Sequence, residues 1–177
     1  MSKKIILIAG PTASGKSKLA IEIAKKIKGE IINADSMQVY KEFSVLSSQP
    51  SKLELKKVKH HLYGFQPAKK HFSTGAWLKL AKKYINLCLK NKKTPILVGG
   101  TGLYFETITK GMSKIPNIDS KARDKIRKLQ KKLGQKKFYE KLLKLDPLVK
   151  NQIGPFDVQR SIRAYEVKKF TKKSIFE

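Results

Sequence analysis

Residues 10–17 constrain the fold of this chain more than any other segment, because they match the phosphate-binding pattern G-x-x-x-x-G-K-[ST] without a gap. The apolar run at residues 5–9 is typical of a buried strand, and residues 18–24 follow with the spacing of a helix. In this context the glycines let successive backbone N–H groups face one anion, and the helix N-terminus adds partial positive charge. The sequence therefore predicts a site for a diphosphate or triphosphate rather than a glycine-rich turn without a ligand.

Two side chains of this P-loop carry charge or metal-binding chemistry. Lys16 can reach the outer oxygens of a phosphate chain, and the hydroxyl of Ser17 can ligate Mg²⁺. We therefore expect Mg²⁺ as the cofactor, with Ser17 as its protein ligand. The residues expected to bind the phosphates, whether of ATP or of another phosphate-bearing molecule, are Gly10, Pro11, Thr12, Ala13, Ser14, Gly15, Lys16 and Ser17.

Strands and helices alternate along residues 1–113. After the first helix we expect strands at 30–35 and 94–98, an extended piece at 60–65, a short helix within the loop 47–59, and helices at 74–90 and 103–110. This alternation predicts an α/β fold, a P-loop NTPase-like parallel sheet with helices on both faces. Ligands of such sheets bind beyond the carboxyl ends of the strands, where we expect the P-loop, Asp35 and Thr101 to surround one site.

The pattern changes after Gly111, because residues 115–117 are typical of a linker and no strand pattern follows them. The remaining residues predict helices at 120–133, 135–145 and 158–171, with breaks at Gly134, at Asp146 and Pro147, and at Gly154 and Pro155. The sequence thus predicts a core domain at residues 1–113 and a small, basic, all-helical subdomain at residues 114–177.

Charge singles out the same C-terminal segment. The chain has 40 Lys and Arg residues against 13 Asp and Glu residues, and a formal net charge of +27. Residues 114–173 hold nineteen of the basic and six of the acidic residues, a net charge of +13. Either a lysine-rich composition fills solvated surface, or the surface binds a polyanion, meaning nucleic acid. We favour nucleic acid.

Composition narrows the class of protein further. No apolar run approaches the ~18 residues of a membrane helix, and the one near the N-terminus is too short for a signal peptide, so we expect a cytoplasmic protein that does not contact a membrane. The single cysteine, Cys88, excludes an intrachain disulfide and has the spacing of a helix core residue. His60, His61 and His71 fit no standard zinc spacing, so we expect no metal-binding role for them.

Further candidates for chemistry each have a simpler alternative. Asp35, expected at a strand end, holds Mg²⁺ through water, acts as a general base, or caps the segment that follows. Thr101 offers a hydroxyl at the same edge or belongs to a tight turn. Arg160 and Arg163 share a helix face, and they either contact phosphates and bases or leave Arg163 to pair with Glu166 on the surface.

Five blocks of sequence, taken in order, resemble one enzyme family. They are GPTASGKS at 10–17, NADSMQVY at 33–40, HHL at 60–62, VGGTGLY at 98–104 and D-x-x-R-x-x-RA-x-EV at 157–167. Blocks of this kind occur in this order in the tRNA dimethylallyltransferases, and the resemblance spans nearly the whole chain. A P-loop alone is common, but the five blocks together are specific.

The resemblance implies transfer of a dimethylallyl group from dimethylallyl diphosphate to N6 of the adenosine 3′ of the tRNA anticodon, with release of diphosphate. Lys16, Ser17 and Mg²⁺ would stabilise the leaving diphosphate, and Asp35 would accept a proton from the N6 amine. The basic subdomain would be the inserted domain that grips the anticodon stem-loop. The positions that match the family's tRNA contacts are Asp35, Ser36, Met37, Gln38, Thr101, Arg123, Gln159, Arg160, Ser161, Ile162 and Arg163.

Three features depart from the family pattern. Ser17 replaces the usual Thr and keeps the hydroxyl, whereas Phe156 replaces the usual Asn and could alter how the helix that carries Arg160 is capped. The chain also stops at Glu177, where the family continues, so we expect the return to the core domain to be absent from this chain. Two alternatives stay open: a P-loop kinase that phosphorylates a small molecule with ATP, and a non-catalytic tRNA-binding remnant. We expect a monomer.

Overall fold

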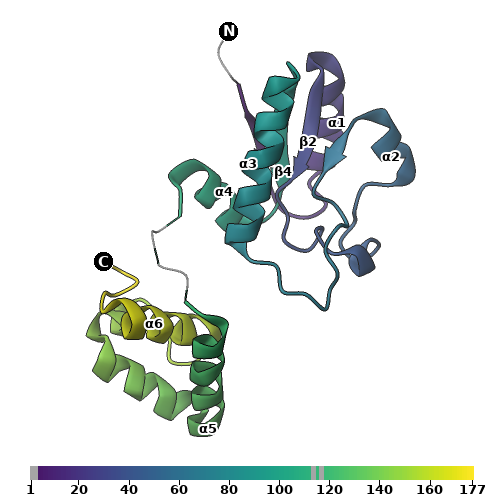
Figure 1. The fold of residues 1–177 in the computed structure, drawn as a ribbon. Helices are drawn as coiled ribbons and strands as arrows, with labels where there is room; N and C mark the ends of the chain where they lie inside the picture. The colour runs from purple at the N-terminus through teal and green to yellow at the C-terminus, as the bar shows by residue number, and fades with distance from the viewer. Residues whose placement is uncertain (1–3, 113–114, 116–117) are drawn as a thin grey trace. The chain divides into compact units, whose positions relative to one another are not determined.

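The computed structural model describes residues 4–112, 115 and 118–177. The chain divides into two compact units, Met1–Met112 and Ser113–Glu177, which run from purple to teal and from green to yellow in Figure 1. The linker expected at residues 115–117 includes residues 116 and 117, which lie outside the described residues. Among the described helices, none combines the length and the apolar character needed to cross a membrane.

A four-stranded parallel sheet with the strand order β1-β4-β2-β3 forms the centre of the first unit. The strands are β1 (Ile6–Ala9), β2 (Gly29–Asn33), β3 (His60–His61) and β4 (Thr94–Gly99). Although β4 comes last in the chain, it lies between β1 and β2, and its Ile96 is paired with Ile6 on one side and with Ile31 on the other. The predicted parallel sheet is confirmed.

Two strands are shorter than the sequence predicts. β2 ends at Asn33, whose side-chain Oδ1 accepts a hydrogen bond from the backbone N–H of Asp35 at 2.9 Å and turns the chain out of the strand. Asp35 therefore lies in the loop after β2. The extended piece expected at 60–65 contributes only the two residues of β3, because Leu62 has a left-handed φ of 65° that ends the edge strand.

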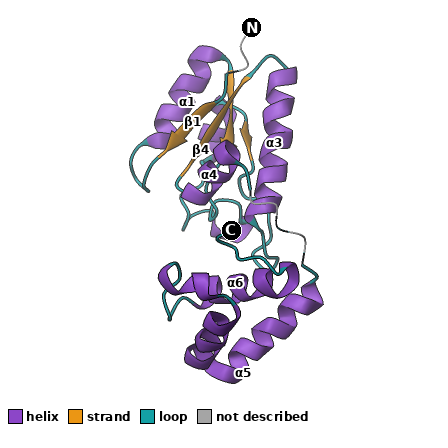
Figure 2. Ribbon diagram, turned by 90° about the vertical axis from the view of Figure 1, so that its left-hand side faces the viewer, coloured by secondary structure: helices purple, strands orange, loops and turns teal. Residues whose placement is uncertain are grey.

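Helices cover both faces of the sheet, as predicted. They are α1 (Lys16–Ile27), η1 (Lys41–Phe43), α2 (Lys52–Lys57), α3 (Thr74–Lys90) and α4 (Gly102–Lys110). Figure 2 shows α1 and α3 on opposite sides of the strands. Because successive strand residues point to opposite faces, Ile31 packs with Ala24 of α1 while Ile32 packs with Trp77 of α3. The ring of Tyr104 in α4 stacks on Trp77 at a centroid distance of 4.1 Å.

The second unit is built from helices, as far as it is described. They are α5 (Ser120–Leu145), η2 (Pro147–Asn151) and α6 (Val158–Thr171). The predicted break at Gly134 is confirmed: its φ of 71° interrupts α5, and the two arms of the helix run in different directions in Figure 1. Phe138, Leu142 and Tyr165 lie in the core between α5 and α6, with the rings of Phe138 and Tyr165 5.1 Å apart.

Side-chain caps fix where the helices of this unit begin. The carboxylate of Asp119 accepts the backbone N–H of Lys121 at 3.0 Å at the start of α5. At the start of α6, Asp157 accepts the backbone N–H of Arg160, also at 3.0 Å. Phe156, directly before this cap, is 88% exposed and leaves it intact.

Candidate functional site

The P-loop joins the end of β1 to the start of α1. Ala13 and Gly15 have φ angles of 64° and 79°, so the loop curls through two left-handed residues before the helix begins. Gly15 is the N-cap and has no side-chain capping hydrogen bond, and the first turn of α1 carries no acidic residue. A helix start with these properties directs its backbone N–H groups and its dipole at an anion.

Lys16 lies across this loop. Its Nζ donates a hydrogen bond to the carbonyl oxygen of Pro11 at 2.8 Å, which holds the ammonium group above the residues expected to surround the phosphates. Ser17, the next residue, is exposed, and its hydroxyl is an oxygen ligand of the kind that Mg²⁺ prefers. The loop thus fits a phosphate chain and its cation.

Asp35 and the first residue of the P-loop, Gly10, both lie next to Gly100. A Cβ on Gly100 would lie 3.3 Å from the carbonyl oxygen of Gly10 and 3.4 Å from Oδ2 of Asp35, so both groups face the same point. The other oxygen, Oδ1, accepts the backbone N–H of Met37 at 2.9 Å. The local capping role considered for Asp35 is therefore real, and it leaves Oδ2 for chemistry.

Thr101 ties the loop after β2 to the loop after β4. Its Oγ1 accepts the backbone N–H of Ser36 at 2.8 Å and lies 3.2 Å from Ser36 Oγ, to which it donates. Its own N–H donates to the carbonyl oxygen of Ala34 at 3.3 Å. Beneath this link, Gly99 has no room for a side chain, because a Cβ there would lie 2.1 Å from the carbonyl carbon of Ala34.

Two residues that sequence reasoning missed support Asp35. Asn33 is fully buried, and its Nδ2 donates to the carbonyl oxygens of Asp35 at 2.9 Å and of Leu62 at 3.0 Å. The indole N–H of Trp77 donates to the carbonyl oxygen of Asn33 at 2.8 Å. A buried amide at the end of an apolar strand was the available signal for Asn33, whereas nothing in the sequence linked Trp77 to it.

Of the other predicted tRNA contacts in the first unit, Met37 is 52% exposed. Gln38 is held within the protein, because its Nε2 donates to the carbonyl oxygens of Ser47 and Ser48 at 2.8 and 3.0 Å. Burial, followed by the charges of Tyr40 and Asp35, raises the pKa of Tyr104 to about 12, so this neighbour of the site stays a neutral phenol.

In the second unit, α6 presents the predicted segment 159–163 unevenly. The side chains of Gln159 and Arg160 are exposed, whereas Ser161 and Ile162 are buried and serve the core. Contact with tRNA stays a prediction for all five residues of this segment, and burial leaves the side chains of Ser161 and Ile162 the least accessible of them.

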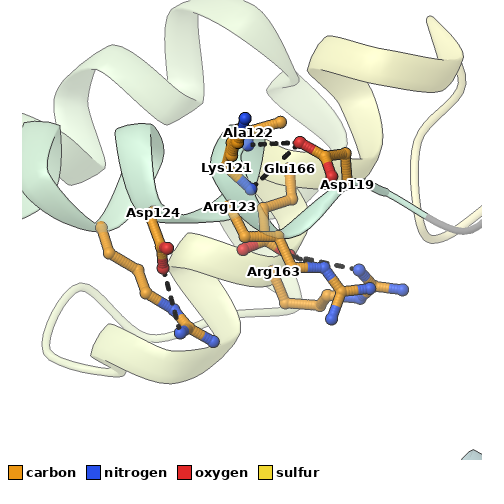
Figure 3. A network of polar contacts seen from close by, with 8 residues as sticks. Asp119, Lys121, Ala122, Arg123, Asp124, Arg163 and Glu166 are labelled. Carbon is orange, nitrogen blue, oxygen red and sulfur yellow. Dashed lines mark hydrogen bonds and ion pairs between the residues drawn. The ribbon is translucent and has the colours of Figure 1, made fainter.

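Arg163 and Arg123 meet at one carboxylate, shown in Figure 3. Nη1 of Arg163 donates to Oε2 of Glu166 at 3.2 Å, so the pairing considered as an alternative for Arg163 is present. Nε of Arg123, on α5, lies 4.0 Å from the same oxygen. Glu166 itself is 3% exposed, so this group is not the surface pair that the sequence suggested.

A family model described as IPP transferase matches residues 38–177. The chain belongs to the IPP transferase family. It is 60% identical to the tRNA dimethylallyltransferase of Pelagibacter ubique (strain HTCC1062) over 98% of this chain and 56% of that protein. It is 47% identical to the tRNA dimethylallyltransferase of Rickettsia bellii (strain OSU 85-389) over 98% of this chain and 55% of that protein. The chain thus spans about half the length of the curated relatives it matches.

Solved structures of similar proteins agree with the family. A eukaryotic dimethylallyltransferase acting on tRNA superposes with a TM-score of 0.82 at 30% identity, over 98% of this chain and 43% of that one. The tRNA isopentenylpyrophosphate transferase of Bacillus halodurans superposes with a TM-score of 0.62 at 33% identity, over 98% of this chain and 57% of that one.

This IPP transferase chain also contains a buried polar cluster behind the sheet. Nε2 of His61 lies 2.6 Å from Oε2 of Glu30, to which Sγ of Cys88 donates at 3.6 Å. Burial opposes ionisation of Glu30, but the hydrogen bond from His61 and the charge of Lys59 hold the pKa of this carboxyl below its usual value. Cys88 is buried, as predicted. The sequence spacing of the histidines did not reveal this grouping.

Proposed function

We propose that this chain supplies the diphosphate site, the proton acceptor and an RNA-binding unit of a tRNA dimethylallyltransferase. The enzyme transfers a dimethylallyl group from dimethylallyl diphosphate to N6 of the adenosine 3′ of the anticodon. The observation that carries the proposal is the meeting of Asp35 Oδ2 and the start of the P-loop at Gly100, because the transfer needs an acceptor for a proton next to a site for a diphosphate. The 60% identity to a tRNA dimethylallyltransferase supports it.

In the proposed reaction, N6 of adenine forms a bond to C1 of the dimethylallyl group while the bond from C1 to the diphosphate oxygen breaks. The diphosphate takes the electron pair and leaves, and the proton of N6 passes to Asp35. Lys16 and the N–H groups at the start of α1 stabilise the charge that develops on the diphosphate. Mg²⁺, held through Ser17, would add further positive charge at the same oxygens.

The proposed substrate also accounts for the charge of the second unit. Its seven acidic residues are Asp119, Asp124, Glu140, Asp146, Asp157, Glu166 and Glu177. Asp119 and Asp157 cap helices, Asp146 accepts the buried hydroxyl of Ser174 at 2.7 Å, and Glu166 pairs with arginines. Few carboxylates are left to offset the nineteen basic residues of this unit, as suits an RNA backbone.

The direct test incubates the chain with Mg²⁺, dimethylallyl diphosphate labelled in the prenyl group, and an unmodified tRNA with adenosine 3′ of the anticodon. We expect label in the tRNA and release of diphosphate. Lys16→Ala removes the ammonium group and should abolish diphosphate binding while tRNA binding survives. Equal loss of both would contradict separate sites for the two substrates.

The other outcomes separate the alternatives. ATP hydrolysis or phosphoryl transfer without prenylation would favour a small-molecule kinase. Salt-sensitive tRNA binding without transfer would favour a tRNA-binding remnant, unless activity appears when the chain is extended with the C-terminal part of the Pelagibacter ubique relative. Activity only in the extended protein would assign the complete site to the longer enzyme.

A tRNA substrate also implies a cytoplasmic enzyme. Whether the protein is a monomer, as we expect, can be measured by size-exclusion chromatography.

A further inference from the structure

Glu166 is the carboxylate around which two arginines of the second unit gather. It lies on α6, one turn after Arg163, and its side chain is 4% exposed. Oε2 of Glu166 accepts from Arg163 at 3.2 Å and lies 4.0 Å from Nε of Arg123, which comes from α5. Figure 3 shows both guanidinium groups beside this carboxylate. One oxygen therefore holds two cations from different helices next to each other.

The charges in this group do not balance. Two guanidinium groups face one carboxylate, and Nε of Arg123 is buried without a hydrogen-bond partner among the described residues. The neighbouring carboxylates are engaged elsewhere: Asp119 accepts the N–H groups that start α5, and Asp124 lies 3.7 Å from Arg127. The group thus keeps a surplus of one positive charge, which an anion can neutralise.

The two arginines are placed to bind such an anion together. Their side chains are 35% and 36% exposed, so each keeps donors that solvent or a ligand can reach. A phosphate accepts paired N–H donors from planar guanidinium groups at good geometry, which ammonium groups cannot offer. Because Glu166 accepts a hydrogen bond from Arg163 and lies at ion-pair distance from Arg123, we expect phosphate binding here to cost less conformational entropy than it does for free surface lysines.

The family resemblance already implies that Arg123 and Arg163 contact tRNA. We propose that these two arginines share one backbone phosphate of the RNA, and that Glu166 is the positioning residue that holds them as a pair. The proposal rests on the proposed function, in which this unit binds tRNA, and adds how one of its sites works. Glu166 carries negative charge yet strengthens RNA binding, because the order it imposes on two arginines outweighs its own repulsion of the phosphate.

The proposal can be tested by whether affinity for RNA falls or rises when Glu166 loses its negative charge. The full chain is titrated with an RNA hairpin that carries a tRNA anticodon stem-loop sequence, and Glu166→Gln is compared with Glu140→Gln, which removes an exposed carboxylate of the same unit. Removing a carboxylate that does not position the arginines should leave affinity for the hairpin unchanged or raise it. We expect this result for Glu140→Gln. We expect Glu166→Gln to weaken binding by about tenfold, the loss that results when two long side chains must be ordered on binding.

A salt titration counts the phosphates. In Arg123→Gln/Arg163→Gln/Glu166→Gln the carboxylate leaves together with its partners, so no buried charge is left unpaired and the fold is kept. If the arginines share one phosphate, the slope of log K against log salt falls in magnitude by about 0.7 to 0.9. Two separate phosphates would give about twice that change and would overturn the joint site.

The outcomes distinguish this proposal from the proposed function. Hairpin binding that Glu166→Gln leaves unchanged or strengthens overturns the positioning role while tRNA binding stands. If circular dichroism shows that Glu166→Gln does not fold, the triple variant decides by its salt slope, and an unchanged slope overturns the joint site. A chain that binds no hairpin overturns both proposals.

Discussion

Asp35 uses its two carboxylate oxygens differently. Oδ1 closes the turn to Met37, and Oδ2 faces Gly100 next to the P-loop. The residue types of this site could be read from the sequence because the P-loop pattern is contiguous. The support that Asn33 and Trp77 give to Asp35 could not be predicted from the sequence. The hydrogen bond between these two residues joins positions 44 apart and forms only when α3 packs on the sheet.

Asp35→Asn should separate catalysis from binding. The amide oxygen can still accept from Met37, so the turn is kept, but the side chain can no longer take a proton. We expect turnover to fall by at least about 100-fold, the usual size of general-base catalysis, with little change in affinity for tRNA. Single-turnover prenylation and tRNA titration measure the two effects, with Glu22→Gln, an exposed carboxylate on α1, as control. Unchanged turnover would remove Asp35 from this role.

Cys88 should be inert in the folded protein. Burial, together with the charge of Glu30, raises the pKa of its thiol to about 12, so almost no thiolate forms at pH 8.5. The unfolded thiol ionises near pH 9, and the folded state therefore loses stability as the pH rises above that value. We expect iodoacetamide to modify the native chain at least about 100-fold more slowly than the chain in guanidinium, as measured by mass spectrometry. Equal rates would show that the thiol is accessible.

Among the elements, helix boundaries were more predictable than strand boundaries. Caps and breakers are local, so the start of α3 at Ser73, the break at Gly134 and the limits of α6 follow from neighbouring residues. A strand ends where its partner does, and β2 and β3 stop earlier than their apolar residues suggest. The pairing of Arg163 with Glu166 within α6 was predictable from spacing, but the approach of Arg123 from α5 was not.

Asp157→Ala should loosen the start of α6. The substitution removes the carboxylate that accepts the backbone N–H of Arg160, and lost caps of this kind cost about 1 kcal/mol. Hydrogen exchange of α6 peptides measures the change, which should be largest in the first turn. Asp124→Ala, in an exposed position within α5, is the matched control and should stay within about 0.5 kcal/mol of the parent. The prediction fails if the amides of α6 are protected from hydrogen exchange to the same degree in both variants.

On the scale of the whole molecule, the chain builds separate cores for its two units. Trp77 and Ile32 lie in a core of the first unit, and Phe138 and Leu142 lie in the core of the second. The sequence predicted this division from the end of the strand pattern and the rise in basic charge. Which residues are buried in each core could not be predicted from the sequence, because burial depends on packing between elements that are distant in sequence.

Phe138→Ala should therefore act on one unit only. Phe138 is fully buried, and replacing such a ring costs about 3–5 kcal/mol, enough to unfold a unit of this size. The only tryptophan, Trp77, lies in the first unit, so its fluorescence reports that unit alone. We expect protection of α5 and α6 from hydrogen exchange to fall while the tryptophan unfolding curve and diphosphate binding stay unchanged. A shift of the tryptophan curve would mean that the two cores unfold together.

The strand order has a consequence for the chain during its synthesis. β1 and β2 leave the ribosome first, but they do not pair with each other, because β4 must enter between them. The P-loop, Asp35 and Thr101 come from the ends of these three strands, so they assemble only once residue 101 has emerged. A nascent chain shorter than this has every residue of the P-loop but lacks the neighbouring strand that holds it, and diphosphate can favour folding only after β4 is in place.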